Sequence, residues 1–174
     1  MNEPLGIIVV FLIGALLYVT STRMVRTGTV QVVERQGRYH RILEPGMRML
    51  VPFIERVRAT VNMHEHVVPI SHESVVTSDN RIVHVDLVLY YQVTDPAVAV
   101  YEIGDYAQGV ERLAITTLRD LFGTIDHEQA LAISTVDLGY DLRDTLAGGA
   151  TAWGVIVNRV EITAVRPWES PSPR

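Results

Sequence analysis

The sequence predicts an α+β protein, in which an N-terminal transmembrane helix precedes a domain built from an antiparallel β-sheet and packed helices. Three observations support this prediction. Residues 5–19 form an apolar run without a charge. Residues 29–93 alternate repeatedly between apolar and polar side chains, the period of strands, and residues 105–146 carry apolar side chains at helical spacing. A β-branched segment, 155–163, follows the helices and is expected to return to the sheet.

Length and composition indicate one packed domain with an appendage. The chain has 174 residues, of which 48% are hydrophobic and 20% are charged, so a buried core is expected. It contains no cysteine, which excludes disulfides, thiolate nucleophiles and zinc sites of the cysteine type. Its net charge of -5 argues against a nucleic-acid partner, because binding a phosphate backbone requires an excess of positive charge.

The apolar run Leu5–Val19 predicts a membrane anchor. Extended through Thr22 it reaches 18 residues, close to the roughly 20 that cross a bilayer. A cleaved signal peptide is the alternative, but the residues before the run carry no basic side chain, which a signal peptide requires. The first positive charges, Arg23 and Arg26, follow the run. They predict a single-pass protein of the inner (plasma) membrane, anchored by residues 1–22, with its domain on the cytoplasmic side.

The charges are unevenly distributed along the chain. Residues 23–58 contain eight arginines against three glutamates, a net charge of +5, whereas residues 59–174 contain seven arginines against 16 acids, a net charge of -9. A basic segment directly after an apolar run indicates a surface that meets anionic headgroups, each basic residue contributing about 1 kcal/mol. A basic surface facing only solvent is the alternative.

Strands are predicted through the first half of the chain. Two of them, Thr29–Arg35 and Arg38–Ile42, flank a turn at Gln36-Gly37, where glycine adopts left-handed backbone readily. The clearest strand is Arg81–Val93, which alternates throughout. Shorter strands are expected at Arg56–Met63, Val67–Ile70 and Val75-Val76. The apolar stretch Met47–Ile54 is interrupted by Pro52, which disfavours a central strand.

The second half is predicted to be mainly helical. Asp95 caps a short helix that begins with Pro96. A second helix runs from Asp105 or Tyr106 to about Gly123, and Asp126 caps a turn that extends to Leu131. A last helix begins at Ser134 or Thr135 and ends at Gly148-Gly149. The domain is expected to span residues 23–165, with a short disordered tail at 166–174.

Candidate catalytic residues are few. Four histidines are close in sequence: His64, His66, His72 and His84. His64 and His66 are two residues apart, so on a strand they would share a face, and with His84 they are the candidates for a metal-dependent hydrolase. Solvated histidines are the simpler interpretation, because no metal motif is present. Asp141 and Asp144 are expected on an exposed helix face. No nucleophile elbow or dinucleotide-binding motif occurs, so the sequence predicts no enzyme, cofactor or metal site.

Four segments carry a family resemblance. They are VVERQGRYHRILEPGMRMLVPFIERV (Val32–Val57), TSDNRIVHVDLVLYYQVTDPAVAVY (Thr77–Tyr101), LAITTLRDLFGTIDHEQAL (Leu113–Leu131) and AWGVIVNRVEI (Ala152–Ile162). In this order they resemble the SPFH or Band-7 superfamily of stomatins, prohibitins and flotillins. The similarity covers roughly residues 25–165 and looks closest to the stomatin-like bacterial and archaeal branch.

The resemblance implies a non-enzymatic, membrane-anchored scaffold. Members of the family assemble laterally into large rings or cages, organise lipid microdomains, and modulate neighbouring proteases, channels or transporters. The implied partners are a bilayer with anionic lipids, further copies of the chain or a full-length SPFH paralogue, and an NfeD-type membrane protein or a membrane protease. Six residues are expected to face the membrane: Met47, Met49, Leu50, Val51, Phe53 and Ile54. Four arginines are expected to contact headgroups: Arg23, Arg26, Arg48 and Arg56.

One departure from the family pattern concerns the C-terminus. Family members usually continue after the last strand into a long coiled coil, whereas Pro167 here would interrupt a continuing helix. The sequence therefore does not decide whether the chain assembles into a closed cage. An alternative function follows, in which this chain is a truncated regulatory paralogue that binds a full-length stomatin-like protein and limits its assembly.

Overall fold

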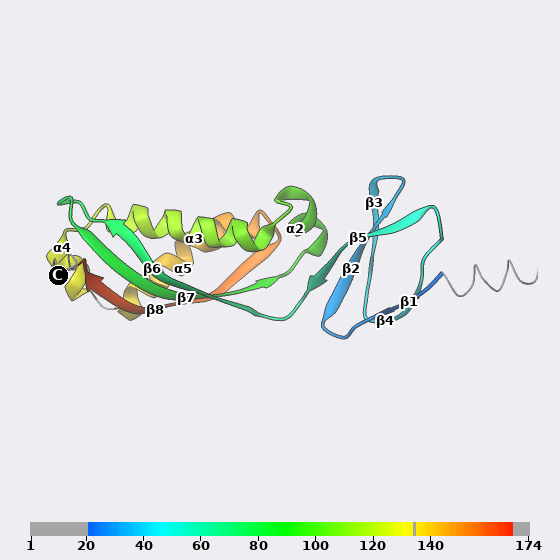
Figure 1. The fold of residues 1–174 in the computed structure, drawn as a ribbon, viewed down its shortest axis with the longest axis horizontal. Coiled ribbons are helices and arrows are strands. Elements are labelled where there is room, and N and C mark those ends of the chain that lie inside the picture. The colour runs from blue at the N-terminus through cyan, green and yellow to red at the C-terminus, as the bar shows by residue number, and fades with distance from the viewer. Residues whose placement is uncertain (1–20, 134, 169–174) are drawn as a thin grey trace, which may run out of the picture. The chain divides into compact units, whose positions relative to one another are not determined.

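The computed structural model describes residues 21–133 and 135–168, which divide between two compact units, residues 1–64 and 65–174. The α+β class is confirmed, because strands fill the first unit and a sheet with helices forms the second (Figure 1). Instead of the single predicted sheet there are three, all of them antiparallel in their pairings.

The described residues of the first unit, 21–64, form five strands. They are β1 (Thr22–Val25), β2 (Thr29–Arg35), β3 (Arg38–Leu43), β4 (Gly46–Met49) and β5 (Glu55–Asn62). Strands β3, β2 and β5 form one sheet, with β2 in the centre, and β1 pairs with β4 in a separate two-stranded ribbon. The β2–β3 hairpin turns at Gln36-Gly37 as predicted, and both residues have positive φ. Thr22, predicted as part of the anchor, belongs to β1 instead because it pairs with Met49.

The second unit contains a three-stranded sheet in the order β6 (His66–Val76), β7 (Ile82–Val93) and β8 (Val155–Pro167). Strand β7 confirms the predicted alternation: the side chains of one face, from Val83 to Val93, are buried, and those of the other are not. In the part of the chain that the structure describes, helices lie along the buried face of this sheet (Figure 1).

Two strand predictions were too short. The segments predicted at 67–70 and 75–76 belong to one strand, β6, which is interrupted by a bulge between Ile70 and Glu73. In the bulge His72 has a φ of 57°, and a bulge of this kind disrupts the alternation on which the prediction relied. Strand β8 continues past residue 163 to Pro167, which pairs with Val83, because proline is tolerated in an edge strand.

Four helices follow β7. They are α2 (Pro96–Glu102), α3 (Tyr106–Phe122), α4 (His127–Ala132) and α5 (Thr135–Thr151). The predicted caps Asp95 and Asp126 are confirmed, since their side chains accept a backbone N–H of the first turn of α2 and α4, and Asp105 caps α3 in the same way. A carboxylate in this position satisfies an N–H that has no partner within the helix.

The predicted end of the last helix was wrong. Helix α5 passes through Gly148-Gly149 and stops at Thr151, and Gly154, with a φ of 67°, makes the turn into β8. Gly149 lies against another helix, since a Cβ on it would be 2.9 Å from the Leu113 side chain on α3. The glycine therefore permits close packing of two helices and does not terminate one.

Two predictions fall at the ends of the chain. The anchor run Leu5–Val19 and residues 169–174 of the predicted tail lie outside the described residues. Within 21–133 and 135–168, no helix has the length and apolar character needed to cross a membrane.

Candidate functional site

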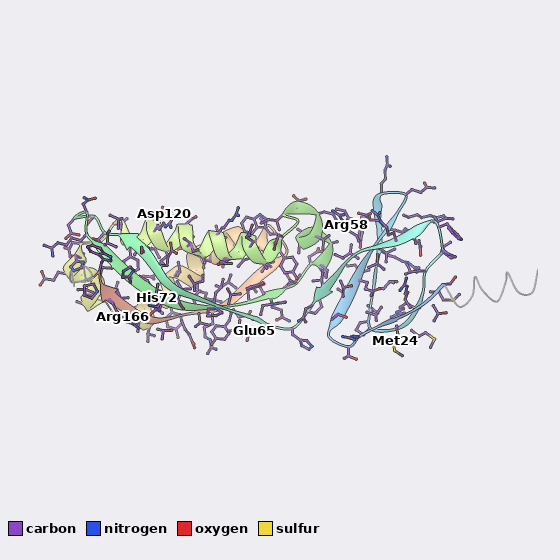
Figure 2. The ribbon with its side chains drawn as sticks, in the orientation of Figure 1. Met24, Arg58, Glu65, His72, Asp120 and Arg166 are labelled. Atoms are coloured by element: carbon purple, nitrogen blue, oxygen red, sulfur yellow. The ribbon has the colours of Figure 1, made fainter. Side chains whose placement is uncertain are left out.

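The ribbon formed by β1 and β4 exposes three methionines on one face. Met24 lies directly opposite Met47, and Met49 is two residues further along β4. Opposed residues of an antiparallel pair point to the same side, as do residues two apart. The three side chains are 79%, 72% and 58% exposed, and sulfur atoms gather beside the labelled Met24 in Figure 2. We call Met24, Met47 and Met49 the methionine face.

The other side of the ribbon carries charge and core contacts. Arg23 lies opposite Arg48, and like charges in direct opposition destabilise a sheet unless an anion lies nearby. Arg48 has a nearby anion, because its Nη2 is 3.0 Å from the Glu44 carboxylate. Val25 points to this side too and is buried in the core of the unit. Arg23 and Arg48, predicted to contact headgroups, therefore lie on the opposite face from the methionines.

A strained turn follows β4 directly. The Ile54 N–H donates to the Val51 carbonyl (3.3 Å), which closes a four-residue turn around Pro52 and Phe53. Phe53 has a φ of 67° and is 97% exposed. Proline in the second position and positive φ in the third are the features of a type II turn, where the third residue is normally glycine or asparagine. Phenylalanine in this conformation costs about 1–2 kcal/mol. We call residues 51–54 the Pro52–Phe53 turn.

Glu55 attaches this turn to the β3 strand. Its side chain is only 3% exposed, and its Oε2 accepts hydrogen bonds from the Arg41 guanidinium (2.9 Å) and the Val51 N–H (3.0 Å). His40 Nε2 lies 3.3 Å from the second carboxylate oxygen. Burial by itself would raise the pKa of Glu55, but the Val51 and Arg41 hydrogen bonds and the charges of Arg41 and His40 outweigh it and lower the pKa. The carboxylate is thus held ionised beneath the exposed turn.

The predicted membrane-facing residues divide into two groups. Five of the six are exposed: Met47, Met49, Val51, Phe53 and Ile54. Leu50 is not, because it is 8% exposed and packs with Val25, Val33 and Leu43 in the core. Its N–H also donates to the Ser21 carbonyl (2.8 Å). The assignment of Leu50 to a membrane-facing surface was therefore wrong.

The remaining two predicted headgroup contacts are Arg26 and Arg56, which are both exposed. Arg56 Nη2 lies 3.3 Å from the carboxylate of Glu34, a residue that is itself 7% exposed and pairs with Arg58 as well. Two arginines of this unit, Arg56 and Arg58, are therefore paired with a buried carboxylate, that of Glu34. The Arg56 side chain is nevertheless 75% exposed, so its guanidinium remains accessible from solvent.

Met24 is the residue that the sequence analysis missed. It stands in a four-residue strand between two arginines, where neither alternation nor composition indicates an apolar surface. Only its pairing with Met47 assigns it to the methionine face.

The candidate histidines do not assemble into a metal site. His64 lies in the bend between β5 and β6, so it does not share a strand face with His66. The His66 ring stacks on Tyr91 at 5.1 Å, and His84 Nδ1 lies 3.2 Å from the Ser74 hydroxyl. Among the residues that the structure describes, no group of three or more His, Asp, Glu or Cys side chains is placed to hold a metal ion.

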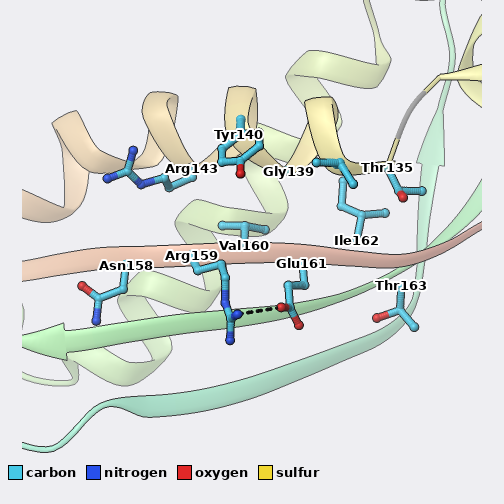
Figure 3. Close-up of a pocket in the computed structure, with 11 residues that line it drawn as sticks. Thr135, Gly139, Tyr140, Arg143, Asn158, Arg159, Val160, Glu161, Ile162 and Thr163 are labelled. Atoms are coloured by element: carbon cyan, nitrogen blue, oxygen red, sulfur yellow. Dashed lines mark ion pairs between the residues drawn. The ribbon is translucent and has the colours of Figure 1, made fainter.

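A groove of about 630 Å³ lies between α5 and β8 (Figure 3). Its apolar lining includes Tyr140 of α5 and Val160 of β8, and its most prominent charges, Arg159 and Glu161, pair with each other at 3.0 Å. Asp141 and Asp144 are exposed on α5 as predicted, and Asp144 pairs with Arg143. Both arginines that line the groove, Arg143 and Arg159, are thus engaged in ion pairs.

Comparison with known proteins agrees with the motifs. Residues 23–170 match the family described as SPFH domain / Band 7. The chain is 40% identical over 163 residues to an uncharacterised protein of Mycobacterium tuberculosis, covering 94% of this chain and 42% of that protein. It is 37% identical over 160 residues to an uncharacterised protein of Methanothermobacter thermautotrophicus, covering 92% and 50%.

A human relative extends the comparison. Stomatin-like protein 2, mitochondrial, is 37% identical over 131 residues, which cover 75% of this chain and 36% of the human protein. The chain thus spans half or less of the length of these three relatives. The match of 23–170, the paired strands and the helices that cover one face of the second sheet lead to one conclusion: the chain belongs to the SPFH domain / Band 7 family.

Proposed function

We propose that the chain is a non-enzymatic membrane scaffold. Its first unit docks on a bilayer containing anionic lipids, on the cytoplasmic side of the plasma membrane. Copies assemble side by side and organise the lipids and membrane proteins around them. Membership of the SPFH domain / Band 7 family and the similarity to a stomatin-like protein support a role of this general kind.

The conformation of Phe53 carries the proposal. A phenylalanine that is 97% exposed and also held at a φ of 67° gains almost no burial in return for its strain. Strained residues persist where the surrounding structure holds them, and they concentrate at functional sites. Here the Glu55 carboxylate holds the turn through Val51. A large aromatic side chain fixed in this way is suited to enter an apolar phase.

The energies favour docking on a membrane. Burying a phenylalanine or methionine side chain contributes about 1.5–3 kcal/mol, and the Pro52–Phe53 turn and the methionine face offer four such side chains. The eight arginines and three glutamates of residues 23–64 give a net charge of +5, which attracts anionic headgroups. The sum of several modest contributions is the usual basis for attachment at an interface.

A single-cysteine experiment tests the docking. Because the chain has no cysteine, Phe53→Cys and Tyr140→Cys variants can each carry one environment-sensitive fluorophore. Tyr140 is the matched control, since it is a 63% exposed aromatic residue on α5. The full chain is reconstituted in vesicles of phosphatidylglycerol and phosphatidylcholine. We expect an apolar emission shift and quenching by brominated lipids at position 53 and not at position 140. A water-like spectrum at position 53 would overturn the proposal.

Lateral assembly is tested separately by photo-crosslinking the full chain in the same vesicles, because the chain has no lysine or cysteine side chain for amine- or thiol-directed reagents. A ladder of homo-oligomers is the expected result. Monomers alone, with adducts only to an added full-length relative, would instead favour the regulatory paralogue.

A further inference from the structure

The thioether sulfur atoms of the methionine face can be oxidised, a reaction that plays no part in the proposed docking. Three of the five methionines in the chain lie together on one side of the β1–β4 ribbon. They are 58% to 79% exposed, whereas methionine is usually a core residue. Met63 is only half-buried at the end of the same unit and serves as an internal comparison. The chain has no cysteine, and among residues 21–133 and 135–168 these three thioethers belong to the most exposed sulfur-containing side chains.

Peroxides convert a methionine thioether into a sulfoxide. The sulfur gives two electrons, the O–O bond of the peroxide breaks, an S–O bond forms, and the second peroxide oxygen leaves as water. Susceptibility to this reaction follows exposure. The product is a strongly polar group, and burying such a group in an apolar phase without a hydrogen-bond partner is unfavourable.

We propose that Met24, Met47 and Met49 form an oxidation-sensitive modification site, at which peroxide converts the methionine face to sulfoxides and releases the ribbon from the bilayer. The inference rests on the proposed membrane docking. Oxidation leaves the fold intact, because the ribbon is joined by backbone pairing and its core contact, Val25, lies on the opposite side. Sulfoxide formation is reversible by methionine sulfoxide reductases, so the site can act as a switch.

The chain offers a direct measurement of the oxidation rates. Cleavage after each arginine places the four methionines in separate peptides, 24–26, 42–48, 49–56 and 59–81. The full chain is treated with hydrogen peroxide, and sulfoxide formation in each peptide is followed by mass spectrometry. We expect Met24, Met47 and Met49 to oxidise several-fold faster than Met63. Equal rates at all four positions would overturn the site.

The effect on docking is measured in vesicles of phosphatidylglycerol and phosphatidylethanolamine. Hydrogen–deuterium exchange of peptides 42–48 and 49–56 is compared before and after peroxide treatment. The matched control is the Met24→Leu/Met47→Leu/Met49→Leu variant, which keeps the apolar face but cannot form sulfoxides there. We expect peroxide to increase exchange in the wild-type protein and to leave the leucine variant unchanged.

Two other outcomes are distinguishable. If the vesicle-dependent protection of the wild-type peptides survives complete oxidation, docking stands and the oxidation switch is wrong. If vesicles give no protection even before oxidation, the docking itself is wrong and the switch is overturned with it.

Discussion

Glu55 and Val51 exchange two hydrogen bonds. The Glu55 N–H donates to the Val51 carbonyl (2.9 Å), and the Val51 N–H donates to the Glu55 carboxylate (3.0 Å). The backbone on both sides of the Pro52–Phe53 turn is fixed by this exchange, and Arg41 links it to β3. A buried carboxylate thus fixes the backbone that presents Phe53, the residue proposed to enter the membrane.

The first prediction concerns the pH dependence of this attachment. Because the pKa of Glu55 is lowered from 4.5, its ionisation stabilises the folded state fully above pH 4.5, and this stabilisation is lost as the pH falls through the lower, folded-state pKa. Glu55→Gln is expected to unfold at lower temperature than the wild-type protein at pH 7. The difference should shrink below pH 4.5, as measured by thermal denaturation. A constant difference down to pH 3 would contradict the assigned role.

The second prediction separates the exposed and buried members of the predicted apolar surface. Leu50→Ala removes a core side chain and should lower the free energy of unfolding by about 2–5 kcal/mol. Phe53→Gly relieves a left-handed φ, so the free energy of unfolding should stay the same or rise by up to about 1 kcal/mol, while docking is weakened because one of its four apolar side chains is removed. Chemical denaturation and the vesicle assay measure the two effects. Strong destabilisation by Phe53→Gly would show that Phe53 contributes to the fold.

The third prediction uses two glycines of α5. A Cβ on Gly139 would lie 2.7 Å from the carbonyl oxygen of Val160 on β8, whereas a Cβ on Gly148 meets nothing within 4 Å. Gly139→Ala should therefore destabilise the protein by about 1–3 kcal/mol through overpacking. Gly148→Ala should stabilise it by about 0.5–1 kcal/mol, because alanine is the better helix former. Similar effects of the two substitutions in denaturant titrations would contradict the helix position.

The fourth prediction concerns the bulge in β6. The Asp86 carboxylate accepts the His72 N–H (2.7 Å) and pairs with Arg166 (3.0 Å). Asp86→Ala should lower the free energy of unfolding by about 1.5–3 kcal/mol. Asp86→Asn keeps an acceptor for the N–H and loses the charge that pairs with Arg166, whose side chain is 61% exposed, so it should cost less, about 1 kcal/mol. Equal losses in urea titrations would show that charge, and not the hydrogen bond to the bulge, is what matters.

The sequence predicted those elements whose signal is local. Alternation over residues 81–93 identified β7 and its buried face, and Asp95 before Pro96 identified the start of α2. These features depend on residues next to each other in the chain, which a single sequence displays directly.

Features set by distant residues could not be predicted in this way. The burial of Leu50 depends on Val25 and Leu43, and the exposure of Met24 depends on its pairing with Met47. Gly149 looked like a helix terminator, because the sequence does not reveal Leu113 packed against it. The exposed apolar surface was therefore predicted in its main residues, but not in its second strand or in the side to which its arginines point.

The position of β8 late in the sequence has a consequence for folding during translation. Strands β1 to β5 lie within residues 22–62 and can pair soon after they leave the ribosome. Strand β7 cannot pair with β8 at this stage, because β8 has not yet been synthesised. The hydrogen bond from the Thr94 hydroxyl to the Gly154 carbonyl, at the start of β8, joins residues 60 apart. At about 5–20 residues per second, translation leaves β7 without this neighbour for about 3–12 seconds. During that time its apolar face lacks one of its two flanking strands and is open to chaperones.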